Sequence, residues 1–173
     1  MVRFERASYA FLKEQRKFIL SDVSERSMCG ELMKYLLRQI KGTSFSDYYV
    51  DVEYNRNDGK IKTIMNLEEK IINITCDIVV HSRGENIHQD NLLAIEMKKS
   101  GHPQYEKNKD KERLITLTKD TFDDVWSYDG TTFPDHVCRY VLGVYYEINV
   151  ELEIVEIEYY VKGKFYKKYS QMF

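Results

Sequence analysis

Apolar residues in the first forty positions recur with the spacing of α-helices. Residues 3 to 20 carry one apolar stripe, and residues 25 to 40 carry a second one three and four positions apart. The second stripe consists of Met28, Leu32, Tyr35, Leu36 and Ile40. Ser24 offers an N-cap oxygen before this stripe, and Gly42 is a plausible stop after it. The pattern therefore predicts two consecutive helices.

Further along the chain, short apolar runs separated by polar segments predict strands. The expected strands cover residues 48 to 54, 70 to 82, 92 to 100, 139 to 148, 150 to 161 and 163 to 169. A third helix is expected near residues 106 to 119. Polar loops are expected at 82 to 91 and 122 to 138, and Asn57-Asp58-Gly59 is a turn signal.

These elements predict an α/β fold with a mixed central sheet. The segment at 92 to 100, the helix at 106 to 119 and the segment at 139 to 148 form a strand-helix-strand unit, whose strands are normally parallel. The other strands can pair as antiparallel hairpins, and the last two form a C-terminal β-hairpin that turns at Lys162-Gly163-Lys164. Helices would then cover the faces of the sheet. A single domain over residues 1 to 173 is expected.

Composition and charge narrow the function classes. The chain has 173 residues, of which 43% are hydrophobic and 31% charged, as in ordinary soluble globular proteins. The net charge of −2 argues against binding to nucleic acid by bulk positive charge, so any such contact must come from local basic patches. Two candidate clusters are Lys98, Lys99, Lys107, Lys109, Lys111 and Arg113, and Lys162, Lys164, Lys167 and Lys168. The alternative for each cluster is a solvated face.

The cysteines and histidines suggest neither a disulfide framework nor a zinc site. Cys29, Cys76 and Cys138 are far apart and odd in number, and the histidines lack ligand spacing. The start of the chain has no signal-peptide pattern, and no apolar run is long enough to span a bilayer. A reduced, cytoplasmic protein without membrane association is expected.

Charged residues inside two otherwise apolar strand segments are the strongest functional signal. Side chains alternate faces along a strand, so Glu96 and Lys98 share a face with Ala94. Asp77 shares a face with Val79 in the preceding segment. The opposite apolar face of that segment is expected to hold Ile72, Ile74, Cys76, Ile78 and Val80. If the segments pair as a hairpin, the three charges converge on one surface.

Two carboxylates at close range repel each other, and a divalent cation is the usual means of keeping both ionised. A lysine beside them can orient or deprotonate water, or stabilise an anion. This equipment suits metal-assisted phosphodiester cleavage. The alternative is a solvated strand edge, because Asp, Glu and Lys are common residues.

The order of elements and the placement of Asp77 and Glu96 resemble the PD-(D/E)xK nuclease superfamily. The resemblance covers about residues 24 to 148 and rests on Cys76-Asp77-Ile78-Val79-Val80 and Ala94-Ile95-Glu96-Met97-Lys98-Lys99-Ser100. It implies an αβββαβ restriction-endonuclease-like core followed by the C-terminal hairpin. The proline that names the family before its Asp is Cys76 in this chain.

The resemblance also implies roles for individual residues. Asp77 and Glu96 would bind Mg²⁺ or Mn²⁺, with the backbone carbonyl of Met97 and water completing the shell. Lys98 would position the attacking water or offset charge on the phosphate. Glu31, on the helix at 25 to 40, would bind the metal through water or orient the inner ligands.

Alternatives remain open for the neighbouring charges. Glu31 could instead be a helix-edge carboxylate that pairs with Lys34 or Arg38. Lys99 should lie on the opposite strand face from Lys98 and is expected to be a surface lysine. Asp110 could reach Lys98 or a backbone amide, but we expect an ordinary solvated helix acid.

The leading interpretation is a metal-dependent nuclease that hydrolyses phosphodiester bonds, with DNA expected in preference to RNA. The competing interpretation is a catalytically silent nucleic-acid-binding or scaffold subunit with the same fold. A homodimer or a partner subunit is compatible with either interpretation. The intact set of Asp77, Glu96 and Lys98 favours the enzyme.

Overall fold

A computed structural model describes the chain over residues 1–54, 56–57, 60–61, 63–65, 71–73, 75–121 and 137–173. Three sequence predictions fall partly outside these residues: the turn at Asn57-Asp58-Gly59, position 74 in the first central strand, and most of the loop at 122 to 138. Within the described residues, no helix is both long enough and apolar enough to cross a lipid bilayer.

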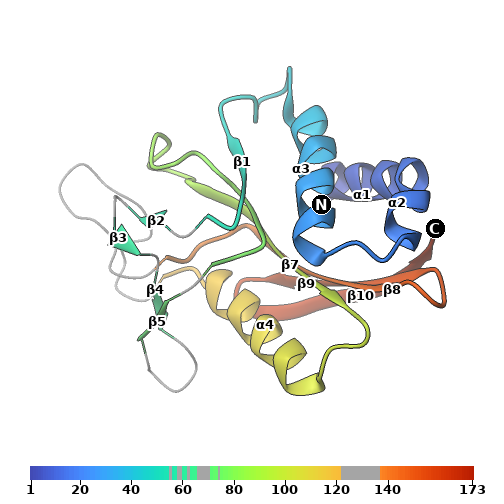
Figure 1. The fold of residues 1–173 in the computed structure, drawn as a ribbon. Coiled ribbons are helices and arrows are strands. Elements are labelled where there is room, and N and C mark those ends of the chain that lie inside the picture. Colours follow the sequence, from blue (N-terminus) through green and yellow to red (C-terminus); the bar gives the residue numbers. More distant parts are fainter. Residues whose placement is uncertain (55, 58–59, 62, 66–70, 74, 122–136) are drawn as a thin grey trace.

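The centre of the fold is a mixed six-stranded sheet with the order β1-β6-β7-β8-β9-β10 (Figure 1). Its strands are β1 (Tyr49–Val52), β6 (Ile78–His81), β7 (Asn91–Lys99), β8 (Leu142–Asn149), β9 (Ile154–Val161) and β10 (Lys164–Met172). Strands β7 and β8 are parallel, whereas every other neighbouring pair is antiparallel. The predicted crossover and the C-terminal hairpin are thereby confirmed.

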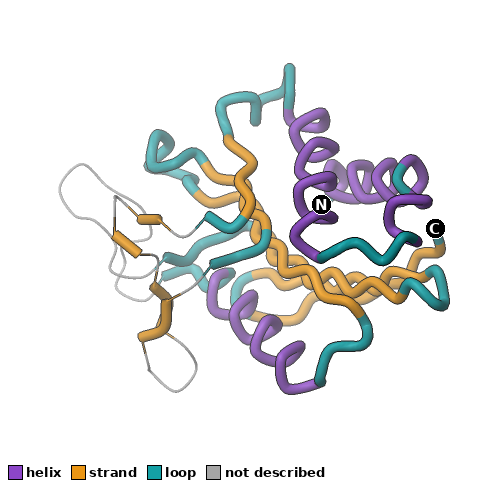
Figure 2. Tube along the Cα trace, in the orientation of Figure 1, coloured by secondary structure: helices purple, strands orange, loops and turns teal. Residues whose placement is uncertain are grey.

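Four helices in the described part of the chain cover the two faces of this sheet. They are α1 (Val2–Glu14), α2 (Arg16–Leu20), α3 (Glu25–Ile40) and α4 (Gln104–Leu117). Helices α1 to α3 lie on one side of the sheet and α4 lies on the other (Figure 2). Two small antiparallel ladders complete the fold: β2 (Arg56–Asn57) with β3 (Lys60–Ile61), and β4 (Thr63–Met65) with β5 (Ile71–Asn73).

The larger core lies between the sheet and helices α1 and α3. The stripe predicted for α3 is buried, and Ser24 caps the helix by accepting a hydrogen bond from the Ser27 amide. Strand β7 contributes Ile95 and Met97, both fully buried. Burying a side chain of this size contributes about 1.5–3 kcal/mol, so the alternation of apolar residues along β7 holds the sheet against α3.

The smaller core lies beneath α4 and includes Val79, Ala94, Leu114 and Leu117. Strand β8 approaches this helix closely at Gly143, where an added Cβ would lie 3.0 Å from Thr118 Cγ2 and 3.3 Å from Leu114 Cβ. The backbone of β8 can therefore approach α4 only because position 143 has no side chain.

Most predicted elements occur within a few residues of their expected bounds, but two predictions were wrong. The helix expected over 3 to 20 ends at Glu14 and restarts at Arg16, since Gln15 has φ −103° and ψ 14°. The strand expected over 70 to 82 is split between β5, which pairs with β4, and β6, which pairs with β1 and β7.

Because β6 begins only at Ile78, strand alternation does not extend back to Cys76. The cysteine was predicted to lie on the face of Ile78 and Val80. It is buried as expected, but it packs beneath α4 with Val79 and Ala94, on the opposite face. Period-two alternation is valid only where a strand is continuous.

Candidate metal and nucleic-acid site

Asp77 lies one residue before β6 and beside the strand that carries Glu96. The antiparallel register ends where Ile78 pairs with Ile95, the residue before Glu96, and Asp77 directly precedes Ile78. The charge of Asp77 acts on Glu96 and raises the pKa of that carboxyl. The Asp77 Oδ2 atom accepts a hydrogen bond of 2.7 Å from the Met97 amide. The structure therefore brings Asp77 and Glu96 together.

Beyond Ile95, β7 has no strand partner on the β6 side among the described residues, because β6 begins only at Ile78. Here carboxylates, and not a neighbouring strand, accept the backbone hydrogen bonds of β7. Asp77 accepts from the Met97 amide, and Glu25 Oε1 accepts from the Lys99 amide at 2.6 Å. In an antiparallel ladder the N–H and C=O groups of one residue point the same way. The carbonyl of Met97 therefore faces the same edge as the carboxylate of Asp77.

Glu96 and Met97 extend from opposite faces of β7, and the side chain of Glu96 points toward α4. Its side chain is only 3% exposed, and its Oε1 atom accepts a hydrogen bond of 2.8 Å from Arg113 Nη1. The same guanidinium nitrogen lies 3.2 Å from Asp110 Oδ1. Arg113 and Asp110 belong to α4, so this helix supplies the countercharge that Glu96 needs in a buried position.

Lys98 lies two residues after Glu96 and contacts the same helix. Its Nζ atom is 3.2 Å from Asp110 Oδ2. Burial alone would lower the pKa of Lys98, but the Asp110 carboxylate raises it overall. The prediction of a solvated Asp110 was wrong: its side chain is 9% exposed and lies between Lys98 and Arg113.

Burial raises the pKa of both acids of the predicted motif. Burial raises the pKa of Asp77 to about 6, although the Met97 amide and the Lys98 ammonium oppose the shift. Burial raises the pKa of Glu96 to about 8 despite the opposing charge of Arg113, and the nearby Asp77 adds to the rise. Two buried carboxyls with raised pKa values are a feature of functional sites, although structural ion pairs also produce it.

Glu31, the remaining predicted site residue, forms an ion pair with Lys34 on its own helix. The distance from Glu31 Oε1 to Lys34 Nζ is 2.5 Å. This is the first of the two pairings left open by the sequence. In the part of the chain that the structure describes, no hydrogen bond or ion pair joins Glu31 to Asp77 or Glu96. A role of Glu31 at a metal therefore stays a prediction.

Glu25, the first residue of α3, is the helix acid that reaches the site. Besides accepting from the Lys99 amide, its Oε1 atom lies 3.1 Å from His102 Nε2. The other ring nitrogen of His102 lies 3.0 Å from Glu106 Oε2. Glu25 also raises the pKa of Asp77. The sequence pattern did not single out Glu25, because an acid at the start of a helix is accounted for by the helix terminus alone.

Most lysines and arginines of the two predicted basic clusters are paired with carboxylates. The pairs are Lys98–Asp110, Lys99–Asp22, Lys107–Glu147, Lys111–Glu158, Arg113–Glu96, Lys167–Glu5 and Lys168–Glu156. Lys99 is on the face away from Lys98, as predicted. The expectation of solvated basic faces was wrong for the buried Lys107 and for Arg113.

The donor atoms at the site suit a hard cation, with Mg²⁺ or Mn²⁺ as the expected metals. Within the described residues, no group of three or more Cys, His, Asp or Glu side chains is arranged to hold a metal ion. Mg²⁺, however, is often bound through one or two carboxylates, retained waters and substrate phosphates. Asp77, Glu96 and the carbonyl of Met97 could hold such an ion if Glu96 were freed from Arg113.

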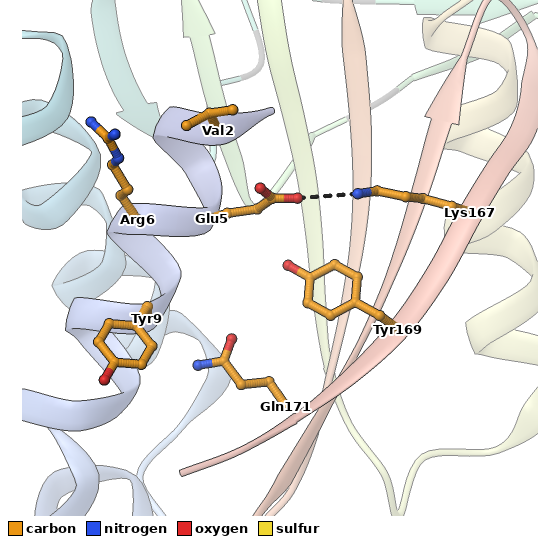
Figure 3. A pocket seen from close by; sticks show the side chains of 7 residues that line it. All are labelled: Val2, Glu5, Arg6, Tyr9, Lys167, Tyr169 and Gln171. Atoms are coloured by element: carbon orange, nitrogen blue, oxygen red, sulfur yellow. Dashed lines mark hydrogen bonds and ion pairs between the residues drawn. The ribbon is translucent and has the colours of Figure 1, made fainter.

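A separate hollow of about 690 Å³ lies between α1 and β10 (Figure 3). It is lined by Val2, Glu5, Arg6, Tyr9, Lys167, Tyr169 and Gln171. The ion pair between Glu5 and Lys167 crosses it at 3.2 Å. None of its lining residues belongs to the carboxylate site around Asp77 and Glu96.

Comparison with known proteins leaves the site to be judged on its geometry. No protein-family model matches the sequence, and no curated protein and no solved structure is significantly similar to it.

Proposed function

We propose that this protein is a metal-dependent nuclease that hydrolyses phosphodiester bonds of nucleic acid, with DNA as the expected substrate. The observation that carries the proposal is that Asp77 binds the amide of Met97, the residue after Glu96, and acts electrostatically on Glu96, with Lys98 two residues beyond Glu96. Both carboxyls are shielded from water enough to raise their pKa values, which is costly unless a ligand uses them.

The order of the main elements is compatible with this proposal once the short strands β2 to β5, between β1 and β6, are left out. The elements α3, β1, β6, β7, α4 and β8 follow the αβββαβ order of the restriction-endonuclease-like core that the sequence resembles. The four strands lie side by side in chain order, and only β7 and β8 are parallel. A fold alone does not define a function, so the site residues bear the argument.

The proposed mechanism assigns one task to each side chain. A bound Mg²⁺ or Mn²⁺ would supply a Lewis acid for the phosphate. Asp77 and Glu96 provide the negative charge that holds it, and the Met97 carbonyl adds a neutral oxygen. Lys98 orients the attacking water or stabilises negative charge that develops on the phosphate.

The test is cleavage of single- and double-stranded DNA by the purified protein in Mg²⁺ or Mn²⁺. We expect Asp77→Asn and Glu96→Gln to lower the rate by about 10²-fold or more. Glu156→Gln is the control, because Glu156 lies on β9 and pairs with the exposed Lys168 outside the site. Cleavage that persists in Asp77→Asn, or a wild-type protein that cuts neither substrate with either metal, would refute the proposal.

A catalytically silent nucleic-acid-binding or scaffold subunit is the second candidate. The observation that favours it is the ion-pair network of α4, in which Arg113 satisfies Glu96 and Asp110 satisfies Lys98 without any metal. Such a protein would bind the same DNA in the cleavage assay without cutting it, and Asp77→Asn would leave the affinity unchanged.

A further inference from the structure

Arg113 forms an ion pair with Glu96, a carboxylate that the proposed metal site requires. Its Nη1 atom is 2.8 Å from Glu96 Oε1, and the two side chains are 24% and 3% exposed. Glu96 is thus covered by α4 on the face where it extends from β7.

The position of Arg113 is determined largely by carboxylates of the site. Besides Glu96, Nη1 contacts Asp110 Oδ1 at 3.2 Å. The Nε atom is buried and has no hydrogen-bond partner among the described residues. A buried donor without a hydrogen bond costs free energy, so the position that pairs Arg113 with Glu96 leaves the guanidinium itself incompletely hydrogen-bonded.

We propose that Arg113 neutralises Glu96 in the metal-free protein and releases it when a divalent cation binds, so that Arg113 opposes the metal and sets its affinity. This inference rests on the proposed function and concerns the regulation of the same site. Arg113 is a positioning residue: it acts through Glu96 and needs no contact with the substrate.

The physical reason is the repulsion between two cations that share one buried carboxylate. Interactions between charges are stronger in the protein interior than in water, because the local dielectric is lower. A guanidinium cannot be deprotonated in a protein, so it can lower this repulsion only by moving. Lys98 adds a second positive charge, and its partner Asp110 could accept Arg113 more fully once Glu96 is released.

The experiment measures Mg²⁺ affinity by calorimetry from pH 7 to 9.5, so that variants are compared where affinity no longer changes with pH. We expect Arg113→Gln and Arg113→Met to bind Mg²⁺ about tenfold tighter than the wild type, because a competing cation is removed. Arg113→Lys retains a positive charge but can lose it by deprotonation, so its affinity should lie between that of the wild type and that of Arg113→Gln and approach the latter at high pH.

Lys111→Gln is the matched control. Lys111 lies on the same helix and pairs with the strand carboxylate Glu158 at 2.8 Å, away from Asp77 and Glu96. Thermal unfolding without metal verifies that each variant is folded. A merely structural arginine would change the melting temperature in both charge-removal variants but would leave the Mg²⁺ affinity unchanged.

The possible outcomes separate this inference from the proposed function. If the wild type binds Mg²⁺, Asp77→Asn does not, and neither Arg113 variant binds more tightly, then Arg113 does not oppose the metal and only this inference fails. Weaker binding in both Arg113 variants would overturn it in the same way. If the wild type binds no Mg²⁺ at any pH, both proposals fail together.

Discussion

A carboxylate as deeply buried as Glu96 needs a countercharge or a proton, and its neighbours decide which of the two it has. Arg113 offers the countercharge at 2.8 Å, whereas burial and the nearby Asp77 favour the proton and raise the pKa to about 8. Arg113 opposes the rise in pKa but does not cancel it. At the scale of single residues, Glu96 can therefore respond to an arriving cation by losing either its proton or its arginine.

Lys98 and its neighbour Lys99 provide an internal comparison of the two faces of β7. Lys98 contacts Asp110 at 3.2 Å beside Glu96, whereas Lys99 pairs with the exposed Asp22 at 2.6 Å. We expect Lys98→Ala to lower cleavage by about 10²-fold, the scale for loss of one acid-base or charge-stabilising group. Lys99→Ala should change the rate by less than about fivefold. Equal cleavage rates in the two variants would show that Lys98 has no catalytic role.

The pKa of Asp77 predicts how stability depends on pH in the absence of metal. Burial raises this pKa from 3.8 to about 6, so the native state binds the proton more tightly than the unfolded chain does. Ionised Asp77 then lowers the free energy of unfolding by up to about 3 kcal/mol above pH 6, and by nothing below about pH 4, where both states are protonated.

We therefore expect the wild type to lose stability relative to Asp77→Asn as the pH rises from about 4 to 7 in EDTA. The asparagine can still accept the Met97 amide but carries no charge at any pH. Urea unfolding at a series of pH values measures the difference between the two proteins. A difference that stays constant over this range would mean that Asp77 titrates as it does in the unfolded chain.

At the scale of elements, α4 differs from α3 in how it is attached to the sheet. Helix α3 buries an apolar stripe, whereas the first turns of α4 are joined to β7, β8 and β9 by ion pairs of Asp110, Lys107 and Lys111. Apolar anchoring of α4 is concentrated near its end, at Leu114 and Leu117. The turns of α4 that contact Lys98 are therefore held on the sheet by ion pairs, and such pairs can exchange one charged partner for another.

The close approach of β8 to α4 gives a prediction at this scale. Gly143→Ala would place a Cβ 3.0 Å from Thr118 Cγ2, so the helix or strand must shift. We expect a loss of about 1–3 kcal/mol in the free energy of unfolding, measured by denaturant titration. Gly30→Ala in α3 is the control, because no atom lies within 4 Å of its added Cβ. That variant should gain up to about 1 kcal/mol from helix propensity. A Gly143→Ala protein as stable as the wild type would show that the contact is not tight.

At the scale of the whole molecule, the candidate site lies where three layers meet. Strand β7 supplies Glu96 and Lys98 at the middle of the sheet, α3 supplies Glu25 on one side, and α4 supplies Arg113 and Asp110 on the other (Figure 1). Strand β7 and α4 each contribute one acid and one base, α3 contributes a further acid, and Asp77 binds the backbone edge of β7 at the Met97 amide. This arrangement follows from the parallel crossover through α4, which returns the chain to the sheet next to β7.

The sequence by itself determined the features that depend on local periodicity. The apolar stripe of α3, the alternation along β7 and the turn at Lys162-Gly163 predicted those elements because each is encoded within a few neighbouring residues. The same alternation placed Glu96 and Lys98 on one face of a central strand. A fully buried strand tolerates such charges only with partners, so the sequence could also indicate that partners exist.

Only the tertiary structure decided which partners these are. Arg113 and Asp110 recur at helical spacing on α4, but their contacts with Glu96 and Lys98 depend on the crossing of α4 over the sheet. Strand pairing likewise decides that the segment 70 to 82 contributes to two separate ladders. It also decides that Cys76 packs on the sheet face covered by α4, and not on the predicted face with Ile78 and Val80. These outcomes depend on contacts between residues distant in the chain, and periodicity within one segment contains no information about them.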